Sequence, residues 1–521
     1  MMRSRPSRRR PAAAALIGAA ALLTFAAPAS AQPPAPQVVP PERSDISPDL
    51  RSIPPGTPRA PLTPREHPVR PLPPLPATRG PLAADTVLQV APLAPINIVA
   101  TSFEGLGVPG YQVSSAPSDT TGAPGHTQYV QWVNTAFAVF DKATGAIVYG
   151  PADGRKIWTN FGGACEQDDD GDPIVLYDRR ARRWLLTQFA VDSGPPYYQC
   201  VAVSRTQDAT GAYARYAYRF EDFNDYPKFG IWPDGYYAAF NMFGPSSFLG
   251  AKACAFDRAK MLAGTAAPMV CFDVPAGGLL PSDLDGTQLP PAGTPNFFLN
   301  FGRDRLNLWR LKANWTQPSQ SQLTGPTVIA VAPFEPACGG GTCIEQPGSG
   351  KLDSLGDRLM FRLAYRRRGS AQSLVVNHSV RVPPGNRAGV RWYEVRNPNG
   401  TPVVHQHGTY APDQNSRWMG SAAMDKAGNI AIGYSVSGTT VGPSVRFTGR
   451  RRTDALGQLR DEAEIVAGAG AQGNKRWGDY ASLNLDPSDD CTFWFTTQYL
   501  SASGSFNWKT RVARMRFGNC Q

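Results

Sequence analysis

Acidic residues recur where short apolar stretches of this sequence begin, often directly after glycine or before tyrosine or proline. Carboxylates that converge in space can bind a cation, or act as acid and base on a sugar. The candidate ligand-binding residues are Asp172, Asp225, Tyr226, Lys228, Asp283, Asp357, Arg417, Arg476 and Asp479, and Asp119 has the equivalent place in the first such stretch. A second interpretation stays open, because aspartate also caps tight turns by accepting hydrogen bonds from backbone amides.

The densest acidic segment is EQDDDGDP, residues 166–173, which is a candidate metal site. Asp168, Asp170 and Asp172 alternate there as at the start of a calcium-binding loop, so calcium is the one cofactor that the sequence suggests. Pro173 stands where a helix-flanked calcium loop has its invariant glycine, and no glutamate closes the loop. The alternative is a solvated loop without a metal.

Other motifs that carry chemistry are weak or absent. His405 and His407 alternate and would share one face of a strand, but two imidazoles alone are a poor metal signal. The sequence has no nucleophile elbow, zinc-protease helix, phosphate loop or dinucleotide fingerprint, so the catalytic residues are unassigned. Tryptophans recur, and we expect most to be buried and one or two to be exposed for stacking on sugars.

The candidate residues are placed by a pattern of strands that repeats along the chain. RWMGSAAMDKAGNIAIGYSV (417–436) and RWGDYASLNLDPSDDCTFWFTTQYL (476–500) both run from Arg-Trp through an Asp-containing turn into an alternating apolar stretch. Alternation with period two predicts strands. Equivalent second strands are predicted at 127–134, 184–191, 236–243, 297–302, 373–380, 430–436 and 491–500.

Seven such units, each of about four strands, predict an all-β fold of the seven-bladed β-propeller class. Stacking small sheets around an axis buries both faces of each sheet, which a single small sheet cannot do. The last unit has a third strand at 508–517, and the chain stops at Gln521. We therefore predict that residues 96–103 supply the outer strand of the last unit and close the ring.

Eight cysteines predict four disulfide bonds and an oxidising compartment. Spacing favours the pairs Cys254–Cys271, Cys338–Cys343 and Cys491–Cys520, which leaves Cys165 with Cys200. No cysteine pair has the two-residue spacing that is typical of a zinc site.

Three segments differ in composition. Residues 1–31 have a basic start, a short apolar run and a small-x-small cleavage site, which predicts a signal peptide and export to the periplasm or beyond. Residues 32–96 hold 19 of the 50 prolines and predict a disordered, extended linker. Residues 97–521 are the predicted propeller domain.

Charge and hydropathy narrow the classes of partner. The formal net charge is +11, and five of these charges lie in the predicted signal peptide, which leaves a mild +6. With no basic stripe interleaved with aromatics, we predict no nucleic-acid binding, and without a long apolar stretch we predict no membrane span. The chain is expected to be a monomer.

Several of these strings carry a resemblance to a known group. GDPIVLYDRRARRWLLTQF, DYPKFGIWPDGYY and the stretch at 476–500, with FNWKTRVARMRF, resemble exported bacterial seven-bladed propeller proteins of uncharacterised activity. The fold is similar in outline to sialidase-like propellers. SDLDGTQL (282–289) lacks the tryptophan of the sialidase turn, so no sialidase residue is transferred.

Two functional hypotheses follow. The first is a secreted binding or adhesion module that recognises an extracellular glycan or protein ligand on the acidic face of the central channel. The alternative is a glycan-active enzyme, a hydrolase or a lyase, that uses carboxylates on the same face. A third possibility is a purely structural part of an envelope assembly.

Overall fold

The computed structural model describes residues 1–2, 34–56, 64–76, 84–96 and 98–521. Contacts divide the chain into two units, Met1–Pro33 and Pro34–Gln521, and the second contains all of the sheets. Apart from its first two residues, the predicted signal peptide lies outside the described residues. Within the described ranges, no helix is long and apolar enough to cross a membrane.

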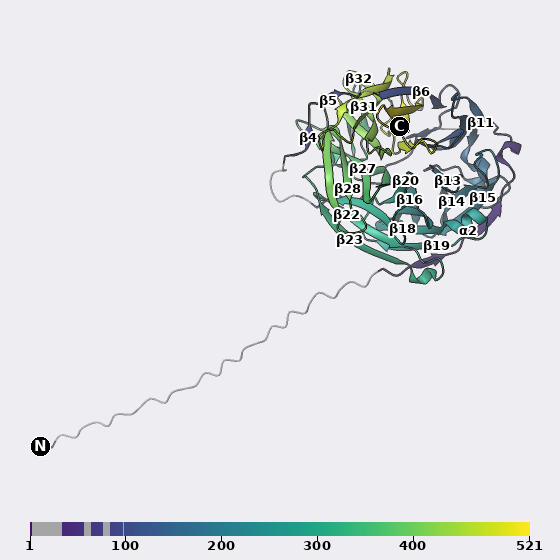
Figure 1. The fold of residues 1–521 in the computed structure, drawn as a ribbon, viewed down its shortest axis with the longest axis horizontal. Coiled ribbons are helices and arrows are strands. Elements are labelled where there is room, and N and C mark those ends of the chain that lie inside the picture. Colours follow the sequence, from purple (N-terminus) through teal and green to yellow (C-terminus); the bar gives the residue numbers. More distant parts are fainter. Residues whose placement is uncertain (3–33, 57–63, 77–83, 97) are drawn as a thin grey trace. The chain divides into compact units, whose positions relative to one another are not determined.

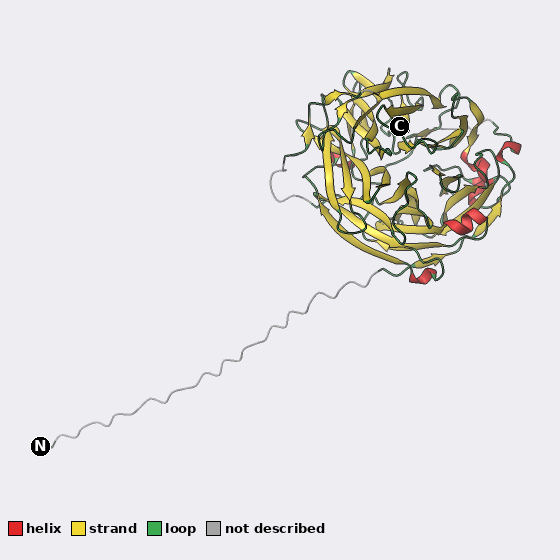
Figure 2. Ribbon diagram, viewed as in Figure 1, coloured by secondary structure: helices red, strands yellow, loops and turns green. Residues whose placement is uncertain are grey.

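The second unit is built almost entirely of antiparallel sheets, as the sequence predicts (Figure 2). The first three sheets follow one another along the chain. They comprise β8 (Thr121–Pro124), β9 (Gln128–Val133), β10 (Ala136–Asp141) and β11 (Ile147–Asp153); β12 (Ile174–Asp178), β13 (Arg183–Ala190), β14 (Tyr197–Ser204) and β15 (Tyr213–Phe220); and β16 (Phe223–Ile231), β17 (Gly235–Phe243), β18 (Phe248–Asp257) and β19 (Met269–Val274).

Two further four-stranded groups join into one nine-stranded sheet, because β20 pairs with β26 in parallel. Its strands are β20 (Leu280–Asp285), β21 (Asn296–Gly302), β22 (Arg305–Lys312), β23 (Gln322–Ala330), β26 (Met360–Arg368), β27 (Ala371–Val382), β28 (Arg387–Arg396), β29 (Val403–Tyr410) and β4 (Leu88–Gln89). The last two sheets comprise β30 (Ser416–Met424), β31 (Ile430–Gly438), β32 (Val441–Arg450) and β34 (Ala463–Gly468); and β35 (Ser482–Leu485), β36 (Phe493–Tyr499), β37 (Lys509–Phe517) and β6 (Ile98–Gly107).

The first strands of these groups contact one another in a cycle. β8 contacts β12, and the contacts continue through β16, β20, β26, β30 and β35 back to β8. Figure 1 shows the sheets arranged around the region that these inner strands enclose. Gly230 allows one close approach in this cycle, because a Cβ atom there would lie 2.5 Å from the carbonyl oxygen of Ser282. The architecture is consistent with a β-propeller.

The chain's early strand β6 completes the last sheet. It pairs with β37 in antiparallel register, with Phe103 opposite Val512 and Ile98 opposite Phe517. The prediction that residues near 96–103 pair with 508–517 is therefore confirmed. Pairing removes the open edge that β37 would otherwise present.

Short elements fill the connections. The remaining strand pairs are β24 (Thr342–Glu345) with β25 (Lys351–Asp353), β3 (Arg65–Glu66) with β7 (Ser115–Ala116), and β33 (Arg460–Asp461) with β5 (Leu93–Pro95). The helical elements are α1 (Ala164–Gln167), α2 (Arg258–Ala263) and the 3₁₀ turns Leu50–Ser52, Gly154–Trp158, Pro318–Gln320 and Ala337–Gly340.

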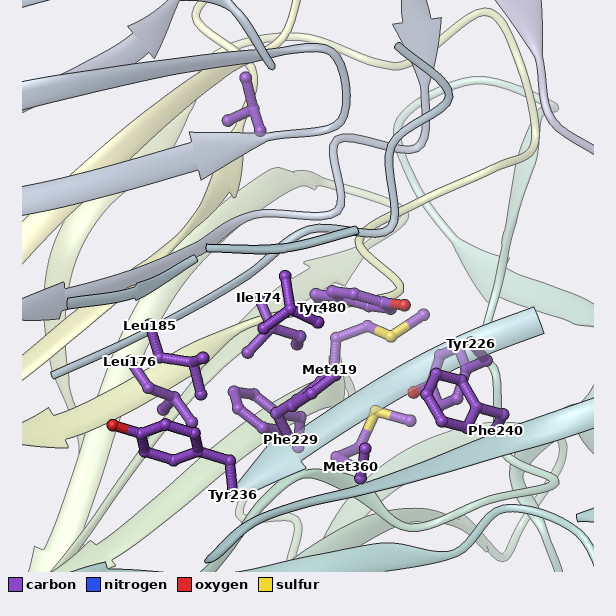
Figure 3. Packing of buried hydrophobic residues seen from close by; sticks show 14 of the residues in the cluster. Ile174, Leu176, Leu185, Tyr226, Phe229, Tyr236, Phe240, Met360, Met419 and Tyr480 are labelled. Carbon is purple, nitrogen blue, oxygen red and sulfur yellow. The ribbon is translucent and has the colours of Figure 1, made fainter. Parts of the chain in front are cut away.

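The core lies between the sheets and beneath the ends of the inner strands. Tyr226, Phe229, Met360 and Met419 belong to one buried cluster with Tyr480 (Figure 3). The eight recurrent tryptophans are all buried: Trp132, Trp158, Trp232, Trp309, Trp392, Trp418, Trp477 and Trp508. The expectation that one or two of them are exposed for sugar stacking is wrong, because the space between neighbouring sheets takes up the indole rings.

All four predicted disulfides are present. Cys254–Cys271 joins the paired strands β18 and β19, and Cys491–Cys520 ties the end of the chain to the last sheet. Cys338–Cys343 and Cys165–Cys200 complete the set.

The prediction of a disordered linker at 32–96 is corrected by the structure, in which described parts of this segment join the sheets. In the described residues, β1 (Gln37–Val39) pairs with β19, β2 (Arg43–Ile46) pairs with β15, and the side chain of Asp45 pairs with buried Arg215 at 2.6 Å. The physical reason is that prolines fall between short proline-free pieces, which need only one hydrogen-bonding edge to join a sheet. Leu50 and Leu72 are buried and anchor the segment.

Candidate functional site

A cavity of about 380 Å³ lies where several inner strands begin. Asp119, Asp172, Asp225 and Asp479 line it, and each belongs to the entrance of a different sheet. Tyr226 and Arg476 line the same cavity. The structure therefore brings together five of the predicted ligand-binding residues, with Asp119 in the equivalent place.

A shared backbone conformation places the acidic residues. Asp119, Asp172, Tyr226 and Asp479 have φ angles of 48°, 47°, 55° and 56°. Aspartate tolerates this left-handed region better than most side chains, whereas a tyrosine there is unusual. The same local conformation recurs at the strand entrances of four sheets, where Asp119, Asp172, Tyr226 and Asp479 all line one cavity.

Asp119 and Asp479 carry unused hydrogen-bonding capacity. Both side chains are buried, and their Oδ1 atoms have no hydrogen-bond partner among the described residues. Burial, together with the nearby Asp479 and Asp172 carboxylates, raises the pKa of Asp119 well above its usual value. Native proteins rarely leave buried acceptors unpaired, so these two oxygens are suited to a ligand that donates hydrogen bonds.

Asp172 and Asp225 lie less deeply in the cavity wall. The hydroxyl of Tyr480 donates to Asp172 at 2.7 Å, and burial is the main cause of the raised pKa of Asp172. Burial and the Asp172 carboxylate raise the pKa of Asp225 to about 7. Asp225 therefore carries its proton over part of the neutral range, which an ordinary aspartate does not.

Lys228 lies beneath the cavity rather than in its lining. Its ammonium group is fully buried, 3.3 Å from the ring centre of Tyr226 and 3.1 Å from that of Tyr480, and donates to the Pro227 carbonyl at 3.1 Å. Burial lowers the pKa of Lys228 well below its usual value. The lysine therefore packs against the rings of both tyrosines.

Two arginines balance part of the acidic charge. Arg476 pairs with Asp479 and with Asp353, and the sum of these interactions raises its pKa. Arg358 lies over the ring of Tyr226, 4.6 Å from its centre, and pairs with Asp357 at 2.7 Å. Both guanidinium groups are held in place by carboxylates, so they offer pre-oriented donors at the cavity wall.

Residues 64–76, which we call the N-terminal strap, extend over the cavity. Glu66 accepts hydrogen bonds from the backbone N–H groups of Lys475 and Arg476 at 2.7 and 3.0 Å, and the His67 carbonyl accepts one from Arg476 at 2.7 Å. The Arg70 carbonyl accepts from Arg358 at 3.1 Å. Part of the predicted linker is thus a wall of the cavity.

The strap also contributes side chains. His67 and Arg70 line the cavity beside the carboxylates. Burial lowers the pKa of His67, although the Asp172 carboxylate opposes the shift. Sequence reasoning missed both residues, because nothing in a proline-rich segment indicates where it lies against a fold.

Three predicted ligand-binding residues, Asp283, Asp357 and Arg417, are not in the lining of the acidic cavity. Asp283 pairs with buried Arg362 at 2.7 Å, which also holds Asp285, and lines a separate small cavity of about 30 Å³. Asp357 accepts the backbone N–H of Leu72 at 3.0 Å and so anchors the strap. A buried arginine holds the carboxylate of Asp283 and a backbone amide that of Asp357, so neither belongs to the acidic cavity.

Arg417 is also placed away from the cavity. It is fully buried and pairs with Asp413 and Glu462, both at 2.7 Å. It stabilises the start of β30 rather than facing a ligand. Arg358, which was not selected from the sequence, lines the cavity together with Arg476. Its one signal in the sequence was its place at a strand entrance after Gly356-Asp357.

The calcium loop predicted from Asp168, Asp170 and Asp172 is not formed. Asp170 accepts from the backbone N–H groups of Val191 and Asp192, Asp168 accepts from Ser193, and Asp172 accepts from Tyr480. Among the described residues, no group of three or more His, Cys, Asp and Glu side chains could hold a metal ion. The three carboxylates have separate partners, so they do not fit calcium.

Comparisons with known proteins are distant. No protein-family model matches the sequence, and no curated protein matches it. Among solved structures, the N-terminal domain of Nup159 is 6% identical with a TM-score of 0.36, covering 83% of this chain and 100% of that one. An endo-arabinase from Bacteroides thetaiotaomicron is 12% identical with a TM-score of 0.26, covering 58% and 95%.

An α-L-arabinofuranosidase from Lactobacillus brevis is 12% identical with a TM-score of 0.29, covering 67% of this chain and 91% of that one. Similarity at this level says nothing about the activity of this chain.

Proposed function

We propose that this chain is an exported seven-bladed β-propeller that binds an extracellular glycan in the acidic cavity. The observation that carries the proposal is the convergence of four carboxylates from four sheets on one cavity, with two buried oxygens that have no partner among the described residues. The cycle of inner-strand contacts and the β6–β37 pairing support the blade count. Four disulfides support export.

The lining suits a ligand rich in hydroxyl groups. Carboxylates accept hydrogen bonds from sugar hydroxyls, Arg358 and Arg476 can donate to ring and hydroxyl oxygens, and the rings of Phe189, Phe223 and Tyr226 provide apolar wall. A cavity of about 380 Å³ has room for one or two sugar rings.

A second candidate function, glycan cleavage, is favoured by the contrast between two of the carboxylates. Asp225 has a pKa raised to about 7 and can hold a proton at neutral pH, whereas Asp479 is ion-paired with Arg476. Glycosidases use such a pair, one carboxylic acid to protonate the leaving oxygen and one carboxylate to act as base or nucleophile.

One experiment tests binding and a second tests cleavage. The purified full chain is applied to an array of glycans, and the affinity of each hit is measured by calorimetry for the wild type and for Asp479→Asn and Asp119→Asn. We expect each substitution to weaken binding about tenfold or more, because each replaces one of the two acceptor oxygens of a buried carboxyl group with an amide donor. Asp273→Asn, an exposed carboxylate on β19, is the matched control.

If no glycan binds, or if the control weakens binding as much as the cavity variants, the proposal is wrong. Each bound glycan is then incubated with the protein and analysed for new reducing ends and for unsaturated products. Binding without release supports a binding module. Release that is lost in Asp225→Asn supports the enzyme.

A further inference from the structure

A second hollow, of about 770 Å³, lies near the other end of inner strand β26. Arg358 of the acidic cavity precedes β26, and Arg366–Arg368 are the last three residues of that strand. Roughly 30 Å of strand therefore separates the two sites. We call this hollow the basic pocket. Its positively charged lining residues are Arg366, Arg367, Arg368, Arg396, Lys426 and Arg452.

The charges in this lining are unbalanced. Five arginines and one lysine face the hollow with a single carboxylate, Asp490. That carboxylate is already bonded to Arg366 at 2.7 Å and to Arg179 at 2.9 Å. Arg396 pairs with Glu394 at 2.7 Å, so it is neutralised within its own sheet.

Four cations remain without an ion pair among the described residues. Arg367 and Arg368 donate to the backbone carbonyls of Leu289 and Lys426. The other two are Lys426 and Arg452. Both are exposed, and neither side chain has an ion pair or hydrogen bond among the described residues. They follow strands β30 and β32, whereas Arg366–Arg368 lie on β26, so two sheets contribute to the pocket. Four positive groups from two sheets thus face one hollow without an ion pair among the described residues.

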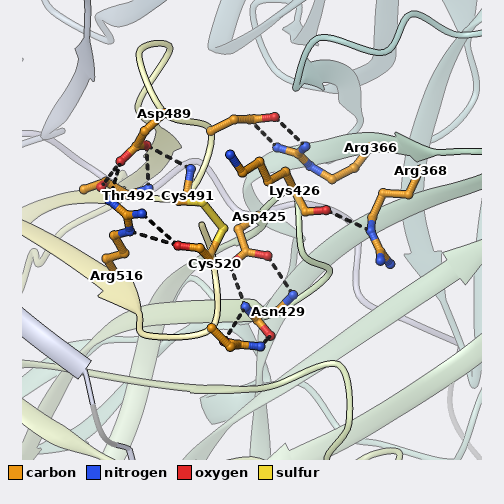
Figure 4. Close-up of a disulfide and its surroundings, with 12 residues drawn as sticks. Arg366, Arg368, Asp425, Lys426, Asn429, Asp489, Cys491, Thr492, Arg516 and Cys520 are labelled. Atoms are coloured by element: carbon orange, nitrogen blue, oxygen red, sulfur yellow. Dashed lines mark hydrogen bonds and ion pairs between the residues drawn. A yellow bond between two sulfur atoms is a disulfide. The ribbon is translucent and has the colours of Figure 1, made fainter.

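Arg368 shows how the cations are held together. Its guanidinium donates to the backbone carbonyl of Lys426 at 3.2 Å, which brings the two residues into contact across the sheets (Figure 4). Burial and the neighbouring guanidinium groups of Arg452 and Arg366 lower the pKa of Arg368. A bound anion would relieve this repulsion and give the free donors acceptors.

The lining also indicates what kind of anion fits. No Phe, Tyr or Trp is among the described lining residues, so the stacking contacts that single-stranded nucleic acids use are absent. Ala371 is its one aliphatic residue, too little apolar surface to insert into a membrane. Thr287 and Gln288 add polar groups that suit sugar hydroxyls.

We propose that the basic pocket binds the oxyanion groups, carboxylate or sulfate, of an acidic polysaccharide. Arginine forks bind such groups in a bidentate manner, and the open hollow can admit a chain rather than one small ion. This site is separate from the acidic cavity, whose carboxylates repel the same ligand. The proposal does not depend on glycan binding there.

The test measures binding of the purified full chain to polygalacturonate and dextran sulfate by calorimetry at about 0.15 M salt, with neutral dextran, pyrophosphate and a mixed-sequence single-stranded DNA as comparisons. The variant is the double substitution Lys426→Gln/Arg452→Gln. The matched control is Arg305→Gln/Lys312→Gln, which removes two exposed cations from β22 and lowers the net charge equally.

We expect at least one acidic polysaccharide to bind, the pocket variant to weaken that binding about tenfold, and the control to change it less than about twofold. Since both replaced side chains are exposed, an unchanged melting temperature shows that the variant is folded. Failure of both acidic polysaccharides to bind overturns the proposal. So does equal weakening by the control, or tighter binding of pyrophosphate or DNA through the same residues.

Discussion

The acidic cavity and the basic pocket lie at opposite ends of the inner strands, and their charges are held in different ways. Asp119, Asp479 and Arg476 are buried, so their charges cost desolvation energy and depend on one another. Lys426 and Arg452 are exposed, and water solvates them without a partner. The net charge of +11 therefore includes two oppositely charged sites, one buried and mutually compensated, the other exposed to water.

The largest expected effect is loss of a buried ion pair at the acidic cavity. Arg476→Met removes the partner of both Asp353 and Asp479 and leaves two buried carboxylates without compensation. We expect the free energy of unfolding to fall by about 3–5 kcal/mol, measured by chemical denaturation. Arg305→Met, at an exposed position, is the control. A loss in Arg476→Met no larger than that of the control would contradict the energetic role assigned to the pair.

The next effect is a pH dependence specific to the acidic cavity. Burial in the folded protein raises the pKa of Asp225 to about 7. A carboxyl group with a raised pKa favours the folded state at low pH. This contribution is lost as the pH rises through the folded pKa. Between about pH 5 and about pH 8, the unfolding free energy of the wild type should therefore fall by about 1–2 kcal/mol more than that of Asp225→Asn.

The basic pocket supplies the contrast to this pH dependence. Lys426→Gln/Arg452→Gln replaces two exposed side chains outside the acidic cavity, so the pH dependence of its unfolding free energy should equal that of the wild type. Comparing slopes between variants cancels the titration of histidines that all of them share. A steeper or unchanged slope in Asp225→Asn would refute the raised pKa.

A smaller effect concerns the strap that covers only the acidic cavity. Glu66→Ala removes the acceptor of two backbone N–H groups and should reduce hydrogen-exchange protection in residues 64–76 by about tenfold, since one or two hydrogen bonds are lost. Glu42→Ala, near β2 on the same N-terminal segment, should leave the strap protected. Equal protection in Glu66→Ala and wild type would show that Glu66 does not hold the strap.

The smallest effect is expected at the basic pocket. Because Lys426 and Arg452 are exposed and unpaired, replacing both with glutamine should change the free energy of unfolding by less than about 0.5 kcal/mol. Relief of repulsion with Arg368 favours a slight gain. If the free energy of unfolding fell by several kcal/mol in thermal or chemical denaturation, these two cations would stabilise the fold and would not be free for a ligand.

Much of the fold was determined by the sequence alone. Alternating apolar residues and Asp- or Gly-containing turns act over a few positions, so the repeated strands at 184–191, 236–243 and 430–436 match β13, β17 and β31. The pairing of the cysteines followed from their short separations in the sequence. The closing strand followed from the last unit, whose sequence contains no fourth strand. Asp119, Asp172 and Asp479 share a left-handed backbone conformation at the start of their strands, and aspartate tolerates this conformation well.

Which charged side chains lack a partner depends on contacts between distant segments. Asp283, Asp357 and Asp479 look alike in sequence, but Asp283 meets buried Arg362, Asp357 holds the strap, and only Asp479 keeps an oxygen free at the cavity. The basic pocket likewise joins Arg368 to Lys426, 58 positions apart and on different sheets. Such contacts depend on the packing of sheets around a common axis, and no local pattern of residues reports them.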